Sequence, residues 1–138
     1  MKYMIMMFGS QRDFDMLSGK AEGGVAWSER DVAALHEFMG KWNNDLVESG
    51  EFVDARGMSA PAHARRVQLR DGVPVVTDGP YPETQEVLAG YTIVECASFD
   101  RATEIAAQLA HTPFPEGTVL EHEWYVDIRP TVDSADEL

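Results

Sequence analysis

The chain has 138 residues, of which 44% are apolar, and its net charge is −13. Length and apolar content favour one globular domain with a substantial core and exclude a largely disordered chain. The negative charge argues against nucleic acid and anionic membranes as partners, because both are bound through Lys and Arg. Cys96 is the only cysteine, which excludes an intrachain disulfide and favours a reducing, cytoplasmic compartment.

The first quarter of the chain predicts a strand and then a long polar stretch. Residues 3–8 form a short apolar run that ends at Gly9, as expected of a buried strand. Residues 9–27 are polar and contain glycines, and they are longer than an ordinary connection, so we expect either a mobile segment or a functional lid. Part of this stretch should pack down through its apolar residues Phe14, Met16, Leu17 and Trp27.

A long helix is predicted next, over residues 28–50. Ser28 and Asp31 have the spacing of an N-terminal capping box, and Gly50 is a natural C-terminal stop. Between them, apolar side chains recur at helical spacing: Val32, Leu35, Phe38, Met39, Trp42, Leu46 and Val47.

The rest of the chain predicts four more strand segments and a second helix. Residues 51–58 read as a short strand, and 63–69 and 73–77 as a hairpin closed by Asp71-Gly72. Residues 88–97 form another strand, and a helix follows that is capped by Ser98 or Asp100 and ended by Thr112-Pro113. Residues 119–128 read as the last strand. We expect a domain over 1–130 and a flexible acidic tail over 131–138.

This order of elements predicts an α+β fold. Strand, helix, strand, hairpin, strand, helix, strand is the ferredoxin-like arrangement with an extra β-hairpin. Two helices cover only one face of the sheet, so the other face is expected to pair with a second copy in a homodimer.

The segment from Thr77 to Glu86 is the most unusual part of the sequence. It reads Thr-Asp-Gly-Pro-Tyr-Pro-Glu-Thr-Gln-Glu, and Gly90-Tyr91 follows shortly after it. Gly79 permits positive φ, and Pro80 holds Gly79 out of the helical region, so a rigid loop is expected. Such a loop either presents its carboxylates for binding or catalysis or is a rigid connection with a solvated acidic face.

Together with Val67 to Gly72, this segment resembles the DGPF domain family of the YCII-related group. The opening Met1 to Met4, the helix ending at Gly50 and the closing residues 128–130 fit the same pattern, which spans about residues 1–130. The chain departs from it at Tyr81, Pro82 and Gln85, where Phe, a small residue and Lys are usual.

The resemblance implies a dimeric α+β barrel in a bacterial cytoplasm. Some members of the family stand beside sigma-factor-like regulators, and the wider group includes a dehydrochlorinase with a proposed His–Asp active site. The family's histidine lies eleven residues before the glycine that ends the first helix. That slot is Met39 here, and His36 lies one turn earlier.

A His–Asp pair can transfer protons near neutral pH, so we predict Asp78 with His36 or His111 as catalytic residues. Tyr81, Arg65 and Trp42 are the predicted substrate-binding residues for a small aromatic or anionic ligand. Four of these six residues have a structural alternative: Asp78 as a turn cap, His36 as a boundary residue, His111 at a helix end and Trp42 in the core.

The sequence contains neither His-x-x-x-His nor His-Glu-x-x-His, and no phosphate-binding or dinucleotide-binding fingerprint. We therefore expect no metal and no cofactor. Two functions follow as hypotheses. One is an enzyme that performs a metal-free elimination or isomerisation on a small molecule. The other is a non-enzymatic ligand-binding or regulatory module.

Overall fold

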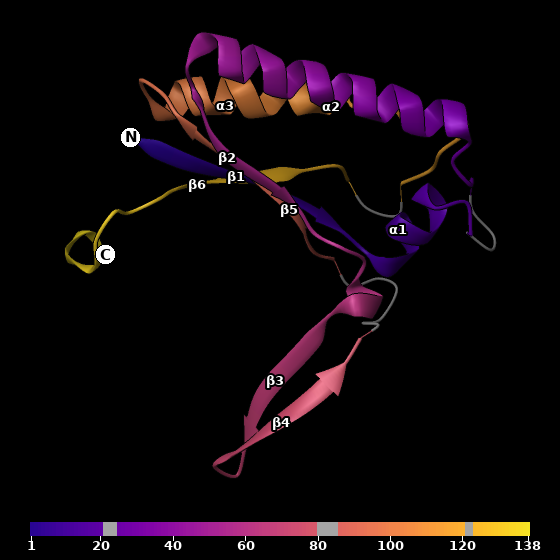
Figure 1. The fold of residues 1–138 in the computed structure, drawn as a ribbon, viewed down its shortest axis with the longest axis vertical. Coiled ribbons are helices and arrows are strands. Elements are labelled where there is room, and N and C mark those ends of the chain that lie inside the picture. Colours follow the sequence, from indigo (N-terminus) through magenta and orange to yellow (C-terminus); the bar gives the residue numbers. More distant parts are fainter. Residues whose placement is uncertain (21–24, 80–85, 121–122) are drawn as a thin grey trace.

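A four-stranded antiparallel sheet, covered on one face by two helices, forms the body of the protein. The computed structural model describes residues 1–20, 25–79, 86–120 and 123–138. In it, β1 (Lys2–Gly9), β2 (Phe52–Gly57), β5 (Val87–Glu95) and β6 (Val126–Pro130) pair in the order β2-β5-β1-β6. The helices α2 (Glu29–Ser49) and α3 (Phe99–Ala107) lie side by side along one face (Figure 1). This strand order confirms the predicted ferredoxin-like α+β fold.

The core lies between this sheet and the two helices. Tyr3, Ile5 and Val94 point toward the helices from β1 and β5, and Trp42 and Leu46 meet them from α2. The small and branched residues Ala102, Ile105, Ala106 and Leu109 complete it from α3 and the short helical turn that follows. Alternate strand residues therefore form the core, and the intervening ones face away from the helices.

Local capping explains where the long elements begin and end. Ser28 Oγ accepts the N–H of Asp31, whose carboxylate accepts the N–H of Ser28, so the predicted capping box is present. Gly50 ends α2 in the left-handed conformation, at φ 79°. Of the two predicted caps of α3, Ser98 holds the position, because its hydroxyl accepts the N–H of Arg101. Both helix predictions are confirmed.

The stretch over residues 9–27 contains a helix that periodicity did not predict. The helix α1 (Gln11–Leu17) has its own capping box, in which Ser10 and Asp13 exchange side-chain and backbone hydrogen bonds at 3.2 and 2.8 Å. Seven residues are too few to show a clear apolar periodicity. Residues 21–24 lie outside the described part of the chain.

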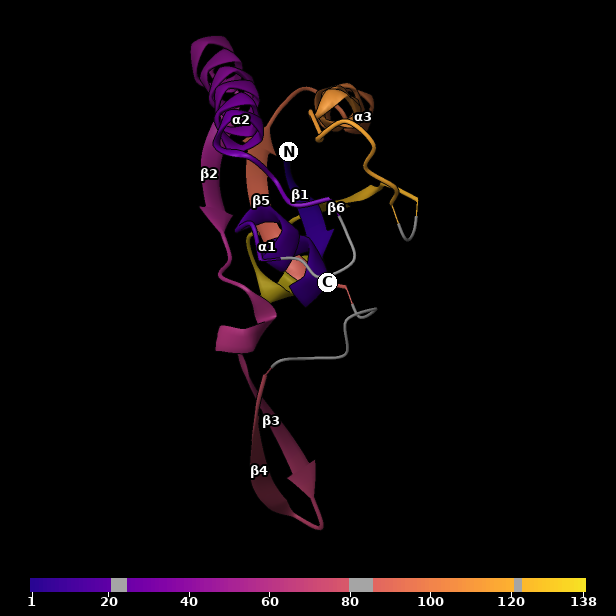
Figure 2. The same cartoon turned by 90° about the vertical axis from the view of Figure 1, so that its right-hand side faces the viewer.

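The predicted hairpin forms a separate two-stranded sheet. The strands β3 (Arg65–Arg70) and β4 (Val73–Asp78) pair with each other and project from the body, away from α2 and α3 (Figure 2). Asp71 and Gly72 close it with φ 49° and 77°, as the turn prediction requires. A short helical turn (Pro61–His63) precedes it.

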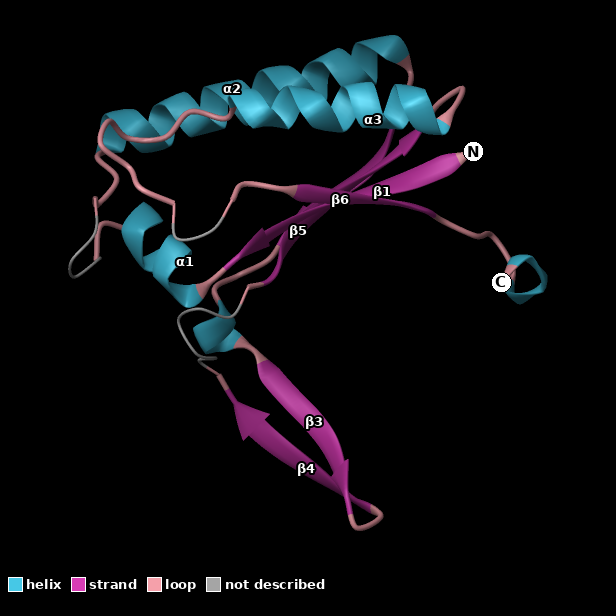
Figure 3. Cartoon of the chain, turned by 180° about the vertical axis from the view of Figure 1, so that it is seen from behind, coloured by secondary structure: helices cyan, strands magenta, loops and turns pink. Residues whose placement is uncertain are grey.

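The last strand is shorter than predicted and starts later. The prediction was residues 119–128, but β6 runs from Val126 to Pro130 and pairs only with β1 in the described structure. Val126 pairs with Met7, the last residue of β1 that has a partner in β6. Trp124 and Tyr125 precede the strand and line a cavity instead. The tail ends in one short helical turn, Ala135–Glu137 (Figure 3).

Candidate functional site

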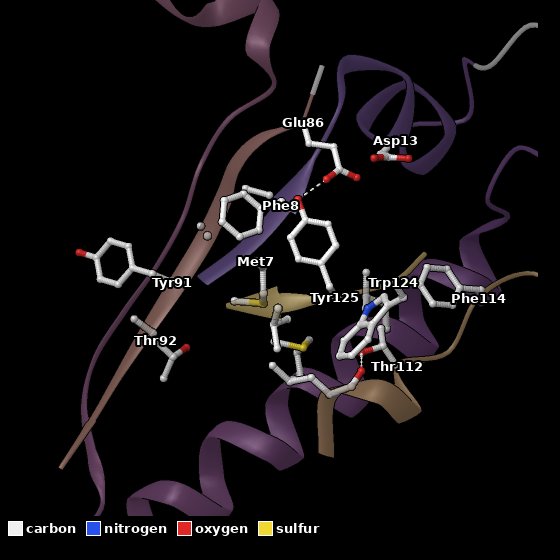
Figure 4. A pocket seen from close by; sticks show the side chains of 18 of the residues that line it. Met7, Phe8, Asp13, Glu86, Tyr91, Thr92, Thr112, Phe114, Trp124 and Tyr125 are labelled. Carbon is white, nitrogen blue, oxygen red and sulfur yellow. Dashed lines mark hydrogen bonds between the residues drawn. The ribbon is translucent and has the colours of Figure 1, made fainter. Parts of the chain in front are cut away.

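A cavity of about 550 Å³ lies between the helix-covered face of the sheet, α2 and the chain that leads into β6. Its walls are mostly apolar, and six aromatic rings contribute to them: Phe8, Trp27, Tyr91, Phe114, Trp124 and Tyr125 (Figure 4 labels all but Trp27). Phe8 stacks on Tyr125 with ring centroids 5.4 Å apart, and Trp27 meets Phe114 edge-on at 6.0 Å. These paired rings give the cavity rigid, flat walls.

A carboxylate and a phenol form the most polar contact of the cavity wall. The Tyr125 hydroxyl donates a hydrogen bond to Glu86 Oε2, although the two residues are 39 positions apart in the chain. This hydrogen bond, together with burial and the negative charges of Glu86 and Asp127, raises the pKa of Tyr125 to about 12. Tyr125 therefore keeps its proton at neutral pH and acts as a donor.

Other polar side chains reach the cavity from α2 and α1. Asn43 donates through Nδ2 to the Met39 carbonyl at 3.0 Å, and its Oδ1 is buried without a hydrogen-bond partner among the described residues. Asp13, the capping residue of α1, also lines the cavity. Hence α1 together with Trp27 forms one wall, and the stretch predicted as a mobile segment or a lid contributes part of the site.

The predicted catalytic residue Asp78 lies elsewhere, at the end of β4. Its Oδ1 accepts a hydrogen bond of 3.1 Å from Arg65 Nε, directly across the hairpin. Both side chains are more than 70% exposed, and neither lines the cavity. Asp78 and Arg65, assigned different roles from the sequence, are thus each other's partners in an exposed ion pair.

Gly79 is required for a reason other than the predicted positive φ. Its φ lies outside the left-handed region. Instead, a Cβ at this position would stand 2.0 Å from the Pro61 carbonyl oxygen. The Gly79 N–H donates to the Ala64 carbonyl at 2.9 Å, so the end of β4 lies tightly against the chain that enters β3.

The long helix turns Met39, and not His36, toward the cavity. Leu35 and Met39 are one helical turn apart and both line the cavity, whereas His36 is exposed. His36 lies one turn before Met39 in the chain, but it is 100° around the helix from Leu35 and is turned to the solvent side. The slot that holds the family's histidine is therefore a cavity position, occupied here by a thioether.

The structure places two more of the predicted residues, His111 and Trp42, away from the cavity. His111 is exposed at the end of the helical turn after α3. Trp42 is buried in the core, where its Nε1–H donates to the Ile105 carbonyl at 3.1 Å. Tyr81 lies outside the described residues. The geometry does not bring Asp78, His36 and His111 together at the cavity, and their catalytic role stays a prediction.

Sequence reasoning missed Glu86, Tyr125, Asn43 and Asp13 as cavity residues. Glu86 is the last acidic residue of the unusual segment, which is a signal that could have been used. Tyr125 was placed in a continuous strand, and Asn43 stands in a helix without any local mark. Within the described ranges, no group of three or more His, Cys, Asp or Glu side chains is placed to hold a metal ion. Likewise, none of the described helices has the length and apolar character to span a membrane.

Comparison with known proteins identifies the family of the chain. A family model described as the YCII-related domain matches residues 1–122. An uncharacterized protein of Rhizobium meliloti (strain 1021) is 28% identical over 86 residues, which cover 62% of this chain and 69% of that protein. Because the family model covers most of the chain, including three of the four strands of the main sheet and both covering helices, the chain belongs to the YCII-related domain family.

Proposed function

We propose that this protein binds a small, largely apolar organic molecule in the cavity between the sheet and α2. The supporting observation is the cavity itself: about 550 Å³, with paired aromatic walls and a few polar side chains. Ligand sites of proteins have this size and composition. Protein interiors otherwise pack with few voids larger than a water molecule, so a packing defect does not account for it.

Filling the cavity tests this proposal. N-phenyl-1-naphthylamine is a neutral probe whose fluorescence rises in apolar surroundings, and Trp27 and Trp124 in the wall can excite it by energy transfer. Ala55 lines the cavity from β2, so Ala55→Phe should weaken probe binding about tenfold or more through steric overlap.

Val53→Phe is the matched control, because Val53 lies on the same strand, is 42% exposed and does not line the cavity. It should bind the probe like the wild type. Equal binding by the wild type and Ala55→Phe would place the probe elsewhere and refute the proposal.

A second candidate function is metal-free acid–base chemistry in the same cavity, carried by Glu86 and Tyr125. The observation that favours it is their contact: a carboxylate that can accept a proton is bound to a phenol that stays protonated. In such a site the carboxylate would act as the base and the phenol would hydrogen-bond to developing negative charge. This arrangement would support an elimination or isomerisation without the Asp78–histidine pair.

Ring opening of 5-nitrobenzisoxazole separates this candidate from binding alone. A base removes the proton from C3, the N–O bond breaks, and a coloured cyanophenolate forms. We expect the wild type to accelerate the reaction over buffer, Glu86→Gln to abolish the acceleration, and Asp78→Asn to retain it. If Asp78→Asn abolishes the acceleration and Glu86→Gln retains it, the base is Asp78 and not Glu86. If the wild type does not accelerate the reaction, this acid–base candidate is wrong and the binding function stands alone.

A further inference from the structure

Four of the hydroxyl groups that line the cavity have their protons engaged by other protein groups. The hydroxyls of Tyr125 and Tyr91 donate to carboxylates, and those of Thr112 and Thr118 donate to backbone carbonyls. Their protons are thereby held within the protein, while their oxygens can still accept. These four hydroxyls therefore match a ligand with N–H donors better than a ligand with acceptors, while the neutral donors of the wall include the indole N–H groups of Trp27 and Trp124.

Asn43 strengthens this bias. A carbonyl can only accept, so the Met39 carbonyl requires the nitrogen of the Asn43 amide and leaves Oδ1 as the outstanding group. That oxygen is buried, and no described residue donates to it. A buried acceptor without a donor costs free energy, which a donor on a bound ligand would recover.

The charged groups of the wall are also mostly negative. Gly9 pairs with Val87, which follows Glu86, and Asp13 is held by the N–H of Ser10, so both carboxylates belong to the same end of β1 (Figure 4). Arg56 is the one cationic side chain among the described lining residues. Its Nη1 donates to Asp54 at 2.6 Å and to the Ala55 carbonyl at 2.7 Å.

We infer that the ligand is an organic amine: an apolar, preferably aromatic body that carries a protonated, N–H-donating nitrogen. The inference rests on the proposed function of the cavity. The carboxylates of Asp13 and Glu86 favour a cation, and the faces of Phe8, Trp124 and the other rings add cation–π attraction. For the same reasons the cavity disfavours a carboxylate or phosphate ligand.

Three probes of one shape test the inference. 1-Naphthylmethylamine, 1-naphthylmethanol and 1-naphthoate share the ring and differ in charge, and calorimetry at neutral pH measures their affinities. We expect the amine to bind about tenfold tighter than the alcohol, and the carboxylate to bind weakest. If the carboxylate binds as tightly as the amine, the inference is wrong. If none of the three binds, the proposed function itself fails.

Two variants separate the local contacts from the overall negative charge of the chain. Glu86→Gln should lower the preference for the amine, whereas Glu95→Gln should not. Glu95 is exposed at the opposite end of β5, and this variant removes the same charge. Equal effects of the two would overturn the inference.

Asn43→Leu keeps the net charge and should weaken binding of the amine and the alcohol but not of naphthoate. If Asn43→Leu leaves the amine affinity unchanged, the acceptor has no role.

Discussion

Single residues of the unusual segment turn out to have separate tasks. Asp78 closes an ion pair with Arg65, Gly79 permits close contact with Pro61, and Glu86 reaches the cavity. The segment from Thr77 to Glu86 thus contributes to the base of the hairpin at its N-terminal end and to the candidate site at its C-terminal end. The sequence identified this segment as unusual. It could not assign these roles to its residues, because each role depends on a partner from a distant segment.

Gly79→Ala is predicted to destabilise the protein by about 1–3 kcal/mol, because the new Cβ would overlap backbone atoms that cannot rotate away. Denaturant unfolding measures the effect. The matched variant is Gly40→Ala in the exposed part of α2, where nothing lies within 4 Å of the new Cβ. It should stabilise by about 0.5–1 kcal/mol, since alanine has less backbone freedom to lose in a helix. A Gly79→Ala protein as stable as the wild type would disprove the close contact.

At the scale of elements, an ion pair connects α3 to Glu51, the residue that precedes β2. Arg101 binds Glu51 through two hydrogen bonds, from Nε at 2.9 Å and from Nη2 at 2.8 Å. Ser49 donates a third to the same carboxylate at 2.8 Å. The Arg101 hydrogen bond, aided by that of Ser49 and by the charge of Arg101, outweighs burial and lowers the pKa of Glu51.

Glu51→Gln should therefore cost about 1 kcal/mol at neutral pH, a modest value because the Arg101 side chain is 38% exposed and partly screened. The folded pKa of Glu51 lies below the unfolded one. The stabilisation is thus present above the unfolded pKa and lost as the pH falls through the folded pKa. Urea unfolding across this acid range should show the two proteins converging. A difference that does not depend on pH would contradict this origin.

Asp45→Asn provides the control for that experiment. Asp45 forms an ion pair of 2.8 Å with Lys41, which lies one turn earlier on the exposed side of α2. Solvent screens such a pair, so its removal should leave the stability nearly unchanged. A loss as large as that of Glu51→Gln would mean that general charge effects dominate.

The molecule as a whole exposes two apolar surfaces that its own helices do not cover. On the sheet face opposite α2 and α3, Met4 pairs with Ile93 in adjacent strands. On the hairpin, Val67, Leu69, Val73 and Val76 are 59–74% exposed. A two-stranded hairpin is marginal in water unless something packs on it. Three of the eleven Lys and Arg residues stand on β3, so the hairpin complements the acidic body of another copy.

We therefore predict a homodimer in which the sheet faces meet and the hairpins lie against the partner. Sedimentation velocity should give twice the mass of the chain. Met4→Glu should produce monomers, because it places a charge in the apolar contact, while Arg129 across from it can pair the new carboxylate and keep the protomer folded. Val47→Glu on α2 is the control and should remain dimeric, since Val47 is 58% exposed on the other side of the molecule. A dimeric Met4→Glu protein would exclude this face. The cytoplasmic location, like the dimer, stays a prediction.

Local signals in the sequence were enough for the fold. Capping residues at Ser28, Ser98 and Gly50, the Asp71-Gly72 turn and the apolar runs act over a few neighbouring residues, so they predicted both long helices, the hairpin and the ferredoxin-like order of strands. Tertiary structure alone decided the site. Which face of α2 meets the cavity, where β6 starts, and that Glu86 binds Tyr125 all depend on side chains from segments far apart in the chain. The periodicity of one segment cannot predict such contacts, because they form only when the sheet and the helices pack together.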